Sequence, residues 1–410
     1  MSYIPPVNCE SLFNPALQSQ SRNTVVSSLI SLKDDPSIIK TLISDSWIKL
    51  LMEGRCSSIT LTPLGERGKV GVPYLLRKLE LTGTKTYILK TSSYTPYSSI
   101  KKVTKDSENS LCLTGDININ LALDEFTNEL LIGYILRNVF ETTGMKSLAV
   151  TYDYGGAYEN TGGIIMEYAD IGNLISVIKY PQFITDGLVR VNILEGIISQ
   201  VLTTIHFLGQ DSIVQFTSGD LKMENILVFN RPMRGTYFSL NVSCPITCKI
   251  GDFGKSSCII RKTDGSHMKI YNRSLLADAY MLVASFHPKI YTTLEGESYY
   301  VVDDTTTAQT YVWMRHSGIG YYRSFDYYTF MVSLLSMREY YVPFFTSREL
   351  IEKFWSPIWI EGYDGELCKQ AIMEKIIKNE RIGTTEAIAI LKNKKLKCKL
   401  IENIVEVKSS

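Results

Sequence analysis

The sequence lacks the segments that would tie a chain to a membrane. Among its 410 residues, no apolar run approaches the about 20 residues that a membrane-spanning helix needs. The stretch 1–6 has no basic region followed by an apolar core, so a secretory signal is not expected. No glycine follows Met1, and a myristoylation signal is therefore not expected either. We expect a protein without a transmembrane segment.

The sequence also lacks an excess of charge of either sign. Its 43 basic and 42 acidic residues nearly cancel, so no strong overall field draws the protein to nucleic acid or to a charged membrane surface. A nucleic-acid partner is therefore not expected. An apolar fraction of 45% and a charged fraction of 21% are ordinary for a globular chain, and 410 residues suffice for two or three domains or lobes.

The eight cysteines are scattered along the chain. Only Cys244 and Cys248 lie close together, and no second pair or histidine follows at the spacing of a zinc site. We expect reduced thiols, which are usual in a cytosolic compartment.

What the sequence does contain is a dense polar stretch at 220–225, between apolar residues. An acid (Asp220), a base (Lys222) and an amide (Asn225) occur within it, and loops held by rigid flanks are common places for catalytic groups. A second carboxylate, Asp252, follows another short apolar segment. Two carboxylates and an amide carbonyl are hard oxygen ligands of the kind that suits Mg²⁺ and phosphate chemistry.

These two stretches resemble motifs of a known family. Asp220-Leu221-Lys222-Met223-Glu224-Asn225 resembles the catalytic loop of the eukaryotic-type protein kinases, and Asp252-Phe253-Gly254 resembles their metal-binding triplet. One departure is the Ser218-Gly219 pair, which stands where the family has His-Arg, so a phosphorylated activation loop lacks its usual docking cation. In this respect the chain resembles the divergent kinases of large DNA viruses, which would place it in the host cytoplasm or in the virion.

The resemblance implies a role for each polar residue. Asp220 would receive the proton of the substrate hydroxyl, and Lys222, the serine/threonine-type choice, would meet the γ-phosphate. Asn225 and Asp252 would hold Mg²⁺ or Mn²⁺, and ATP would be the phosphoryl donor.

A single lysine ends the strand-like segment 86–90. Because apolar residues precede Lys90, its ammonium group would need anionic partners. In the kinase pattern this lysine contacts the α- and β-phosphates and pairs with a glutamate on the following helix. We predict that helix over 124–136 and choose Glu129 as the partner; Glu125, one turn earlier, is the alternative.

Glycines at 65, 68 and 71 precede this lysine. Without a Cβ, they let backbone amides approach phosphates closely. The resemblance to the glycine-rich loop of kinases is partial, because the spacing here is G-x-x-G-x-x-G. We expect Gly65, Gly68 and Val70 to cover the nucleotide; a plain glycine-rich hairpin is the alternative.

The segment 164–170 resembles the kinase hinge. Backbone groups of Glu167 and Ala169 would hydrogen-bond adenine. Met166 would close the back of the pocket and Leu227 would form its floor, since apolar side chains suit an aromatic base.

The remaining patterns predict further elements. We expect residues 1–36 to be loosely ordered or to form one short helix. Other expected elements are a helix over 36–54, strands over 59–62, 147–154 and 163–166, a loop over 91–118, a helix over 189–208, a hairpin of 236–242 with 247–250, an activation segment over 255–325 and a basic helix over 385–401. Asp326 resembles the kinase aspartate that accepts backbone N–H bonds from the catalytic loop, which is a structural role.

These observations together predict an α+β chain with a two-lobed, protein-kinase-like fold: a small antiparallel-sheet N-lobe and a mostly helical C-lobe. The expected divisions are an extension with one helix at 1–56, an ATP-binding lobe at 57–166 and the C-lobe at 167–410. The expected activity is transfer of the γ-phosphoryl group of Mg-ATP to serine or threonine hydroxyls of protein substrates. A catalytically weak pseudokinase or scaffold and a small-molecule kinase remain the alternatives.

Overall fold

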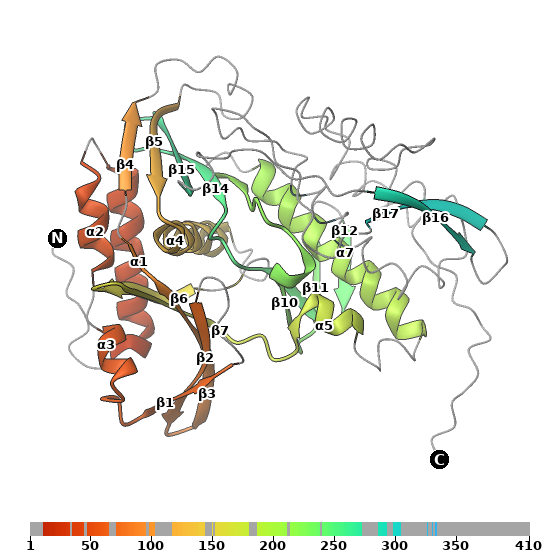
Figure 1. The fold of residues 1–410 in the computed structure, drawn as a ribbon, viewed down its shortest axis with the longest axis horizontal. Coiled ribbons are helices and arrows are strands. Elements are labelled where there is room, and N and C mark those ends of the chain that lie inside the picture. Colours follow the sequence, from red (N-terminus) through yellow and green to blue (C-terminus); the bar gives the residue numbers. More distant parts are fainter. Residues whose placement is uncertain are drawn as a thin grey trace. The chain divides into compact units, whose positions relative to one another are not determined.

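The computed structural model of the chain describes residues 11–32, 35–44, 47–64, 71–95, 98–102, 117–143, 150, 152–179, 187–210, 214–237, 240–272, 286–292, 298–304, 326, 330 and 333. The chain divides into two compact units, whose elements are labelled in Figure 1. Unit 1 comprises Met1–Tyr168, Asp211–Ser218 and Asp252–Asp278, and unit 2 comprises Ala169–Gln210, Gly219–Gly251 and Ala279–Ser410. Two segments of unit 1 thus lie within the range 167–410 that the sequence assigned to the second lobe.

Unit 1 contains a five-stranded antiparallel sheet in the order β1-β2-β3-β7-β6. The strands are β1 (Ile59–Pro63), β2 (Gly71–Glu80), β3 (Gly83–Ser93), β6 (Tyr152–Tyr158) and β7 (Thr161–Glu167). Leu76, Leu89 and Ile165 are fully buried in one cluster, because alternate side chains of neighbouring strands share a face. The strands predicted over 59–62 and 163–166 are confirmed.

One long and three short helices of the N-terminal region cover this sheet. They are η1 (Ser11–Phe13), α1 (Pro15–Ile30), α2 (Ser37–Ile43) and α3 (Trp47–Met52). Helix α1 is well capped, since the Asn14 side chain accepts a hydrogen bond from the Ala16 N–H and Pro15 occupies the first turn. The prediction of loose order or one short helix before residue 36 was wrong here, because α1 has 16 residues. The single helix predicted over 36–54 is two helices, α2 and α3.

Helix α4 (Glu125–Thr143) is the most deeply buried helix described in unit 1. It contacts both β6 and β15, and in Figure 1 it is seen end-on between the two large sheets of the unit. Asp124 caps it by accepting hydrogen bonds from the backbone N–H and the hydroxyl of Thr127, at 3.0 and 2.6 Å. Gly133 is needed for close packing, because a Cβ there would overlap the ring of Tyr152.

The second large sheet of unit 1 has the order β4-β5-β15-β14-β9. Its strands are β4 (Ser98–Lys102), β5 (Ile117–Leu123), β9 (Val214–Thr217), β14 (Ser257–Arg261) and β15 (His267–Asn272). The pair β15–β5 is parallel and the other pairs are antiparallel. The loop predicted over 91–118 therefore contains the end of β3, all of β4 and the start of β5, and the predicted activation segment begins as the β14–β15 hairpin.

Unit 2 combines one long helix, α7, with short helices and short strands. Its elements are β8 (Gly172–Asn173), α5 (Leu174–Lys179), α7 (Gly187–Gln210), η2 (Met223–Asn225), β10 (Ile226–Phe229), β11 (Met233–Tyr237), β12 (Leu240–Cys244), β13 (Thr247–Ile250), β16 (Phe286–Thr292) and β17 (Ser298–Asp304). The predicted helix over 189–208 is confirmed as α7. The predicted hairpin of 236–242 with 247–250 was wrong, because β12 pairs with β11 and β13 pairs with β10.

A buried glutamine of α7 binds the backbone at the start of β13. The Gln200 amide nitrogen donates to the carbonyl of Ile246 at 3.1 Å, and its oxygen accepts from the Cys248 N–H at 2.7 Å. Both backbone groups are buried, where leaving them without a partner would be costly. The described chain as a whole combines helices with mainly antiparallel sheets, as an α+β sequence predicts.

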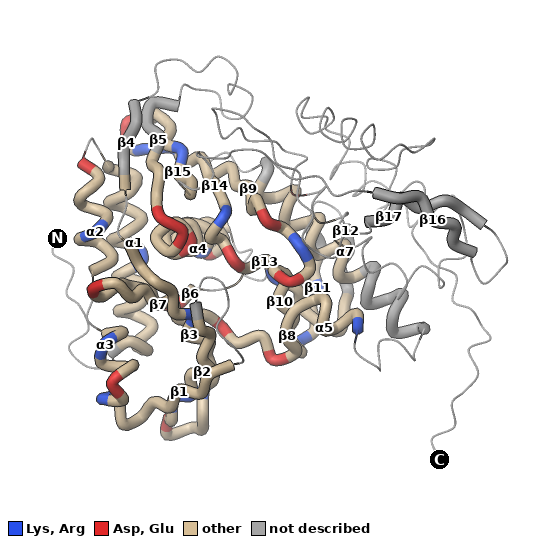
Figure 2. Tube along the Cα trace, viewed as in Figure 1, with Lys and Arg blue, Asp and Glu red and all other residues tan. Residues whose placement is uncertain are grey.

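The thiols differ in part from the sequence prediction. Cys244, Cys248 and Cys258 are buried thiols that form no disulfide, but Cys56 is disulfide-bonded, so the expectation of reduced thiols was wrong at that residue. Scattered spacing in a sequence cannot reveal which sulfurs meet in space. Within the described ranges, none of the helices is long and apolar enough to cross a membrane. Acidic and basic positions are interspersed along both units (Figure 2).

Candidate functional site

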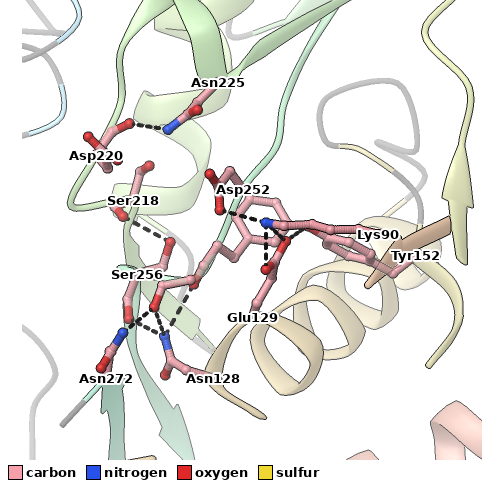
Figure 3. A network of polar contacts seen from close by, with 12 residues as sticks. Lys90, Asn128, Glu129, Tyr152, Ser218, Asp220, Asn225, Asp252, Ser256 and Asn272 are labelled. Carbon is pink, nitrogen blue, oxygen red and sulfur yellow. Dashed lines mark hydrogen bonds and ion pairs between the residues drawn. The ribbon is translucent and has the colours of Figure 1, made fainter. Parts of the chain in front are cut away.

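Lys90, the lysine singled out in the sequence, lies on β3 of unit 1 and is paired in register with Ile164 of β7. Its Nζ donates to both carboxylate oxygens of Glu129, at 2.9 and 2.8 Å, and to Oδ1 of Asp252 at 3.2 Å (Figure 3). The three residues come from strand β3, helix α4 and the segment between β13 and β14, and they are far apart in sequence. The side chain of Lys90 is 21% exposed, so its positive charge is stabilised by the two carboxylates more than by water.

Glu129 is the glutamate that pairs with Lys90. It lies in the second turn of α4 with its side chain 3% exposed, and the hydroxyl of Tyr152 donates to its Oε1 at 3.2 Å. Burial and the nearby glutamate raise the pKa of Tyr152 well above its ordinary value, so the phenol keeps its proton and remains a donor. Two donors thus fix the carboxylate of Glu129 in one orientation.

The charges of this cluster depend on one another. Burial by itself would lower the pKa of Lys90, but the carboxylates of Glu129 and Asp252 outweigh burial and raise that pKa above its ordinary value. Burial raises the pKa of Glu129, the Lys90 ammonium opposes that rise, and Asp252 adds to it. The ammonium is therefore held charged between two carboxylates and is available to an anion placed beside it.

Asp252 has an unusual backbone and an open side chain. Its φ of 56° is in the left-handed region, which a residue other than glycine seldom adopts outside a site that requires it. Its side chain is 45% exposed, whereas the next residue, Phe253, is fully buried. The ring of Phe253 makes edge-to-face contacts with Tyr152 and Phe216, at centroid distances of 5.4 and 5.7 Å. The buried phenylalanine anchors the segment that presents Asp252.

The backbone just after Asp252 is bound by two side-chain amides. Asn128 of α4 donates from Nδ2 to the carbonyls of Phe253, Gly254 and Ser256, at 3.2, 3.1 and 2.8 Å. Asn272 of β15 donates to the Gly254 carbonyl at 2.8 Å, as Figure 3 shows. Asn128 and Asn272 were not predicted from the sequence, because a lone asparagine in an apolar helix or strand carries no motif.

In unit 2, the loop that contains Asp220 is held by its own backbone. The Asn225 side-chain nitrogen donates to the Asp220 carbonyl at 2.8 Å, and the Lys222 N–H donates to the same carbonyl at 2.9 Å. The Lys222 ammonium lies 3.3 Å from Oδ2 of Asp220. The N–H of Gly251 donates to the Asn225 carbonyl at 2.9 Å, which fixes the loop to the end of β13.

Asp326 stabilises the start of this loop. Its Oδ1 accepts a hydrogen bond from the Gly219 N–H at 3.2 Å, and its side chain is buried. Gly219 has a φ of 72°, which favours glycine at this position over the arginine of the kinase pattern. The hydroxyl of Ser333 accepts from the Met223 N–H at 3.0 Å. The hydrogen bond predicted from the backbone of this loop to Asp326 is confirmed by the contact with Gly219.

Each of the two residues expected to hold a divalent cation, Asn225 and Asp252, offers a suitable oxygen ligand. Because the amide nitrogen of Asn225 is bound to the Asp220 carbonyl, the side chain can offer only its oxygen to a ligand. Asp252 offers a partly exposed carboxylate. Both are hard oxygen donors of the kind that Mg²⁺ and Mn²⁺ prefer. Over the described ranges, no cluster of three or more His, Cys, Asp or Glu has metal-binding geometry.

The residues expected around adenine fall in both units. Met166 is buried on β7, and Glu167, the last residue of that strand, is paired with Tyr87 of β3. In unit 2, the Ala169 carbonyl accepts from the Gly172 N–H at 3.1 Å, and Leu227 of β10 is half-buried. The expected phosphate-covering residues Gly65, Gly68 and Val70 lie outside the described residues.

Comparison with known proteins gives no family: no protein-family model and no curated protein sequence matches the chain.

Proposed function

We propose that the protein is a serine/threonine protein kinase with a two-lobed, kinase-like fold, which transfers the γ-phosphoryl group of Mg-ATP to hydroxyls of protein substrates. In this proposal, unit 1 carries the nucleotide-binding elements and unit 2 carries the loop that receives the substrate hydroxyl. The proposal rests on motifs and local geometry, since no family relationship supports it.

One observation carries the proposal: Lys90 is held between Glu129 and Asp252 within unit 1. A largely buried lysine with two carboxylates is costly to maintain for stability alone, because its desolvation offsets much of the attraction. Such an arrangement suits the binding of a polyanion, because the carboxylates hold the Lys90 ammonium charged and in place beside it. The ammonium can contact phosphate oxygens while Glu129 fixes its direction.

The side chains of unit 2 support the transfer step. Asp220 would accept the hydrogen bond of the substrate hydroxyl and take up its proton as the oxygen–phosphorus bond forms. Lys222, 3.3 Å from that carboxylate, would lie close to the transferred group and neutralise its charge. Asn225 and Asp252 would hold Mg²⁺, which supplies charge neutralisation at the phosphates when bound. Because the donor and acceptor groups are held on short, hydrogen-bonded loops, positioning accounts for most of the expected rate.

Incubation of purified protein with Mg-ATP, followed by mass spectrometry, tests the proposal. Phosphate on serine or threonine of the protein itself or of casein would support it. Nucleotide binding without turnover would select the pseudokinase or scaffold instead. Phosphorylation confined to small molecules in a metabolite extract would select the small-molecule kinase.

A further inference from the structure

The two carboxylates on Lys90 belong to separate segments, and one asparagine links these segments. Glu129 is on α4, and Asp252 is on the segment that leads into β14. Asn128, one residue before Glu129, is fully buried and donates to three carbonyls of the segment 253–256 (Figure 3). Any shift of α4 relative to that segment would break these hydrogen bonds together.

The amide of Asn128 acts here as a donor. Among the described residues, its Oδ1 is buried without a hydrogen-bond partner, whereas its nitrogen serves three acceptors. A buried acceptor without a partner destabilises the fold, so a residue that only filled space would be better apolar. A neutral donor also adds no further negative charge beside Glu129 and Asp252. The pattern therefore indicates that the residue's contribution is to bind these carbonyls.

Further contacts hold the same segment from other sides. Asn272 donates to the Gly254 carbonyl at 2.8 Å, and the Ser256 hydroxyl donates to the Ser218 carbonyl at 2.9 Å. Gly254 packs closely on α4, since a Cβ there would lie 3.0 Å from Cγ of Glu125. The hydrogen bonds of Asn128 differ from these contacts in their origin. Among the hydrogen bonds described for the segment, only those of Asn128 come from α4, the helix that carries Glu129.

We propose that Asn128 is a positioning residue, which sets the carboxylate of Asp252 relative to Lys90 and Glu129 and so prepares Asp252 for a divalent cation. The inference rests on the proposed function, because it assigns Asp252 to Mg²⁺. It means that Asn128 links α4 to the segment after Asp252 through hydrogen bonds from an uncharged amide.

Asn128→Asp tests the proposal most sharply, because it keeps the shape of the side chain and replaces the donor with an acceptor. Asn128→Ala is a second variant that removes the donor without adding charge. Asn138→Asp is the matched control, since Asn138 is on the same helix and donates to Asn23 in a solvent-exposed contact. Calorimetry would measure binding of ATP with and without Mg²⁺, and hydrogen exchange would follow peptides that cover 253–257.

Both Asn128 variants should weaken Mg²⁺-dependent ATP binding by roughly 10- to 100-fold, the usual effect of removing a group that orients a metal ligand. Binding of ATP without Mg²⁺ should change little, and exchange at 253–257 should rise. The Asn138→Asp control should match the wild type in each measurement. Unchanged exchange, or an equal loss of ATP binding with and without Mg²⁺, would overturn the proposal.

Failure of the proposed function is distinguishable from failure of this inference. If the wild type binds no ATP in the presence of Mg²⁺, the kinase assignment fails. The exchange measurement then still decides whether Asn128 fixes the segment 253–257, and unchanged exchange in both variants would refute that link.

Discussion

Nζ of Lys90 on β3 lies 2.8 Å from Oε2 of Glu129 on α4, and the glutamate side chain is only 3% exposed. This contact joins the five-stranded antiparallel sheet of unit 1 to the helix packed on it. Because Asp252 also contacts the ammonium, the pair belongs to a cluster with one more negative than positive charge. A cluster of this kind is suited to a ligand that brings both phosphates and a divalent cation.

Replacing Glu129 with glutamine should weaken this cluster. The ammonium of Lys90 would keep Asp252 as an ionic partner, so the free energy of unfolding should fall by about 1–3 kcal/mol, less than for a buried charge left alone. Urea unfolding followed by circular dichroism would measure the change. The matched control is Glu125→Gln, one turn earlier on the same helix, and an equal loss of phosphoryl transfer in both variants would contradict the assignment of Glu129.

The same substitution should change the pH dependence of activity. Both carboxylates raise the pKa of Lys90, so in the wild type the ammonium stays charged as the pH rises past the ordinary lysine value. Its stabilising contribution is present below the unfolded pKa and is lost only as the pH rises through the raised folded pKa. Removing the Glu129 charge lowers that folded pKa.

In measurements of kcat/KM between about pH 7 and pH 10, below the ordinary lysine pKa of ~10.4, the wild type should therefore show no loss of activity from Lys90, whereas Glu129→Gln should begin to lose activity toward the alkaline end of this range. Identical alkaline limbs in the two proteins would show that Lys90 does not titrate with activity. The Glu125→Gln protein serves again as the control and should follow the wild-type profile.

Asp326→Asn should loosen the loop that begins at Gly219. The variant keeps an acceptor for the Gly219 N–H but loses the charge, so a destabilisation of about 1 kcal/mol is expected together with a fall in kcat. Thermal unfolding and steady-state kinetics would measure the two effects. Asp170→Asn is the matched control, because Asp170 accepts from the Asn230 N–H at 2.9 Å at an exposed position of the same unit. A kcat that falls equally in both variants would contradict the role of Asp326.

Elements with a strong local pattern could be predicted from the sequence. Helix α7 and strand β1 have clear apolar periodicity, and the polar residues 220–225 fall between apolar segments. The apolar strand around Lys90 indicated only that its ammonium needs an anionic partner. The choice of Glu129 came from the resemblance to the kinase pattern, which pairs this lysine with a glutamate on the following helix.

The elements that were missed depend on distant partners. Strand β5 has the alternating sequence ININLAL, a local strand signal that the loop predicted over 91–118 overlooked, and its parallel partner β15 is more than a hundred residues away along the sequence. The pairing of β13 with β10 rather than with β12 likewise joins strands separated along the chain by the β11–β12 hairpin. The role of Asn128 can be recognised only from the structure, because the three carbonyls that it binds belong to a segment far from α4 in the sequence.

The most direct test of the account is phosphoryl transfer from γ-labelled ATP by the wild type, Asp220→Asn and Asp252→Ala, with Asp264→Asn at an exposed turn as the control. The wild type and the control should label serine or threonine. The other two variants should lose roughly 100- to 1,000-fold in rate, the scale of removing one preorganised charged group, with unchanged circular dichroism. Labelling that survives in either Asp220→Asn or Asp252→Ala, or none in the wild type with Mg-ATP, would contradict the central claim.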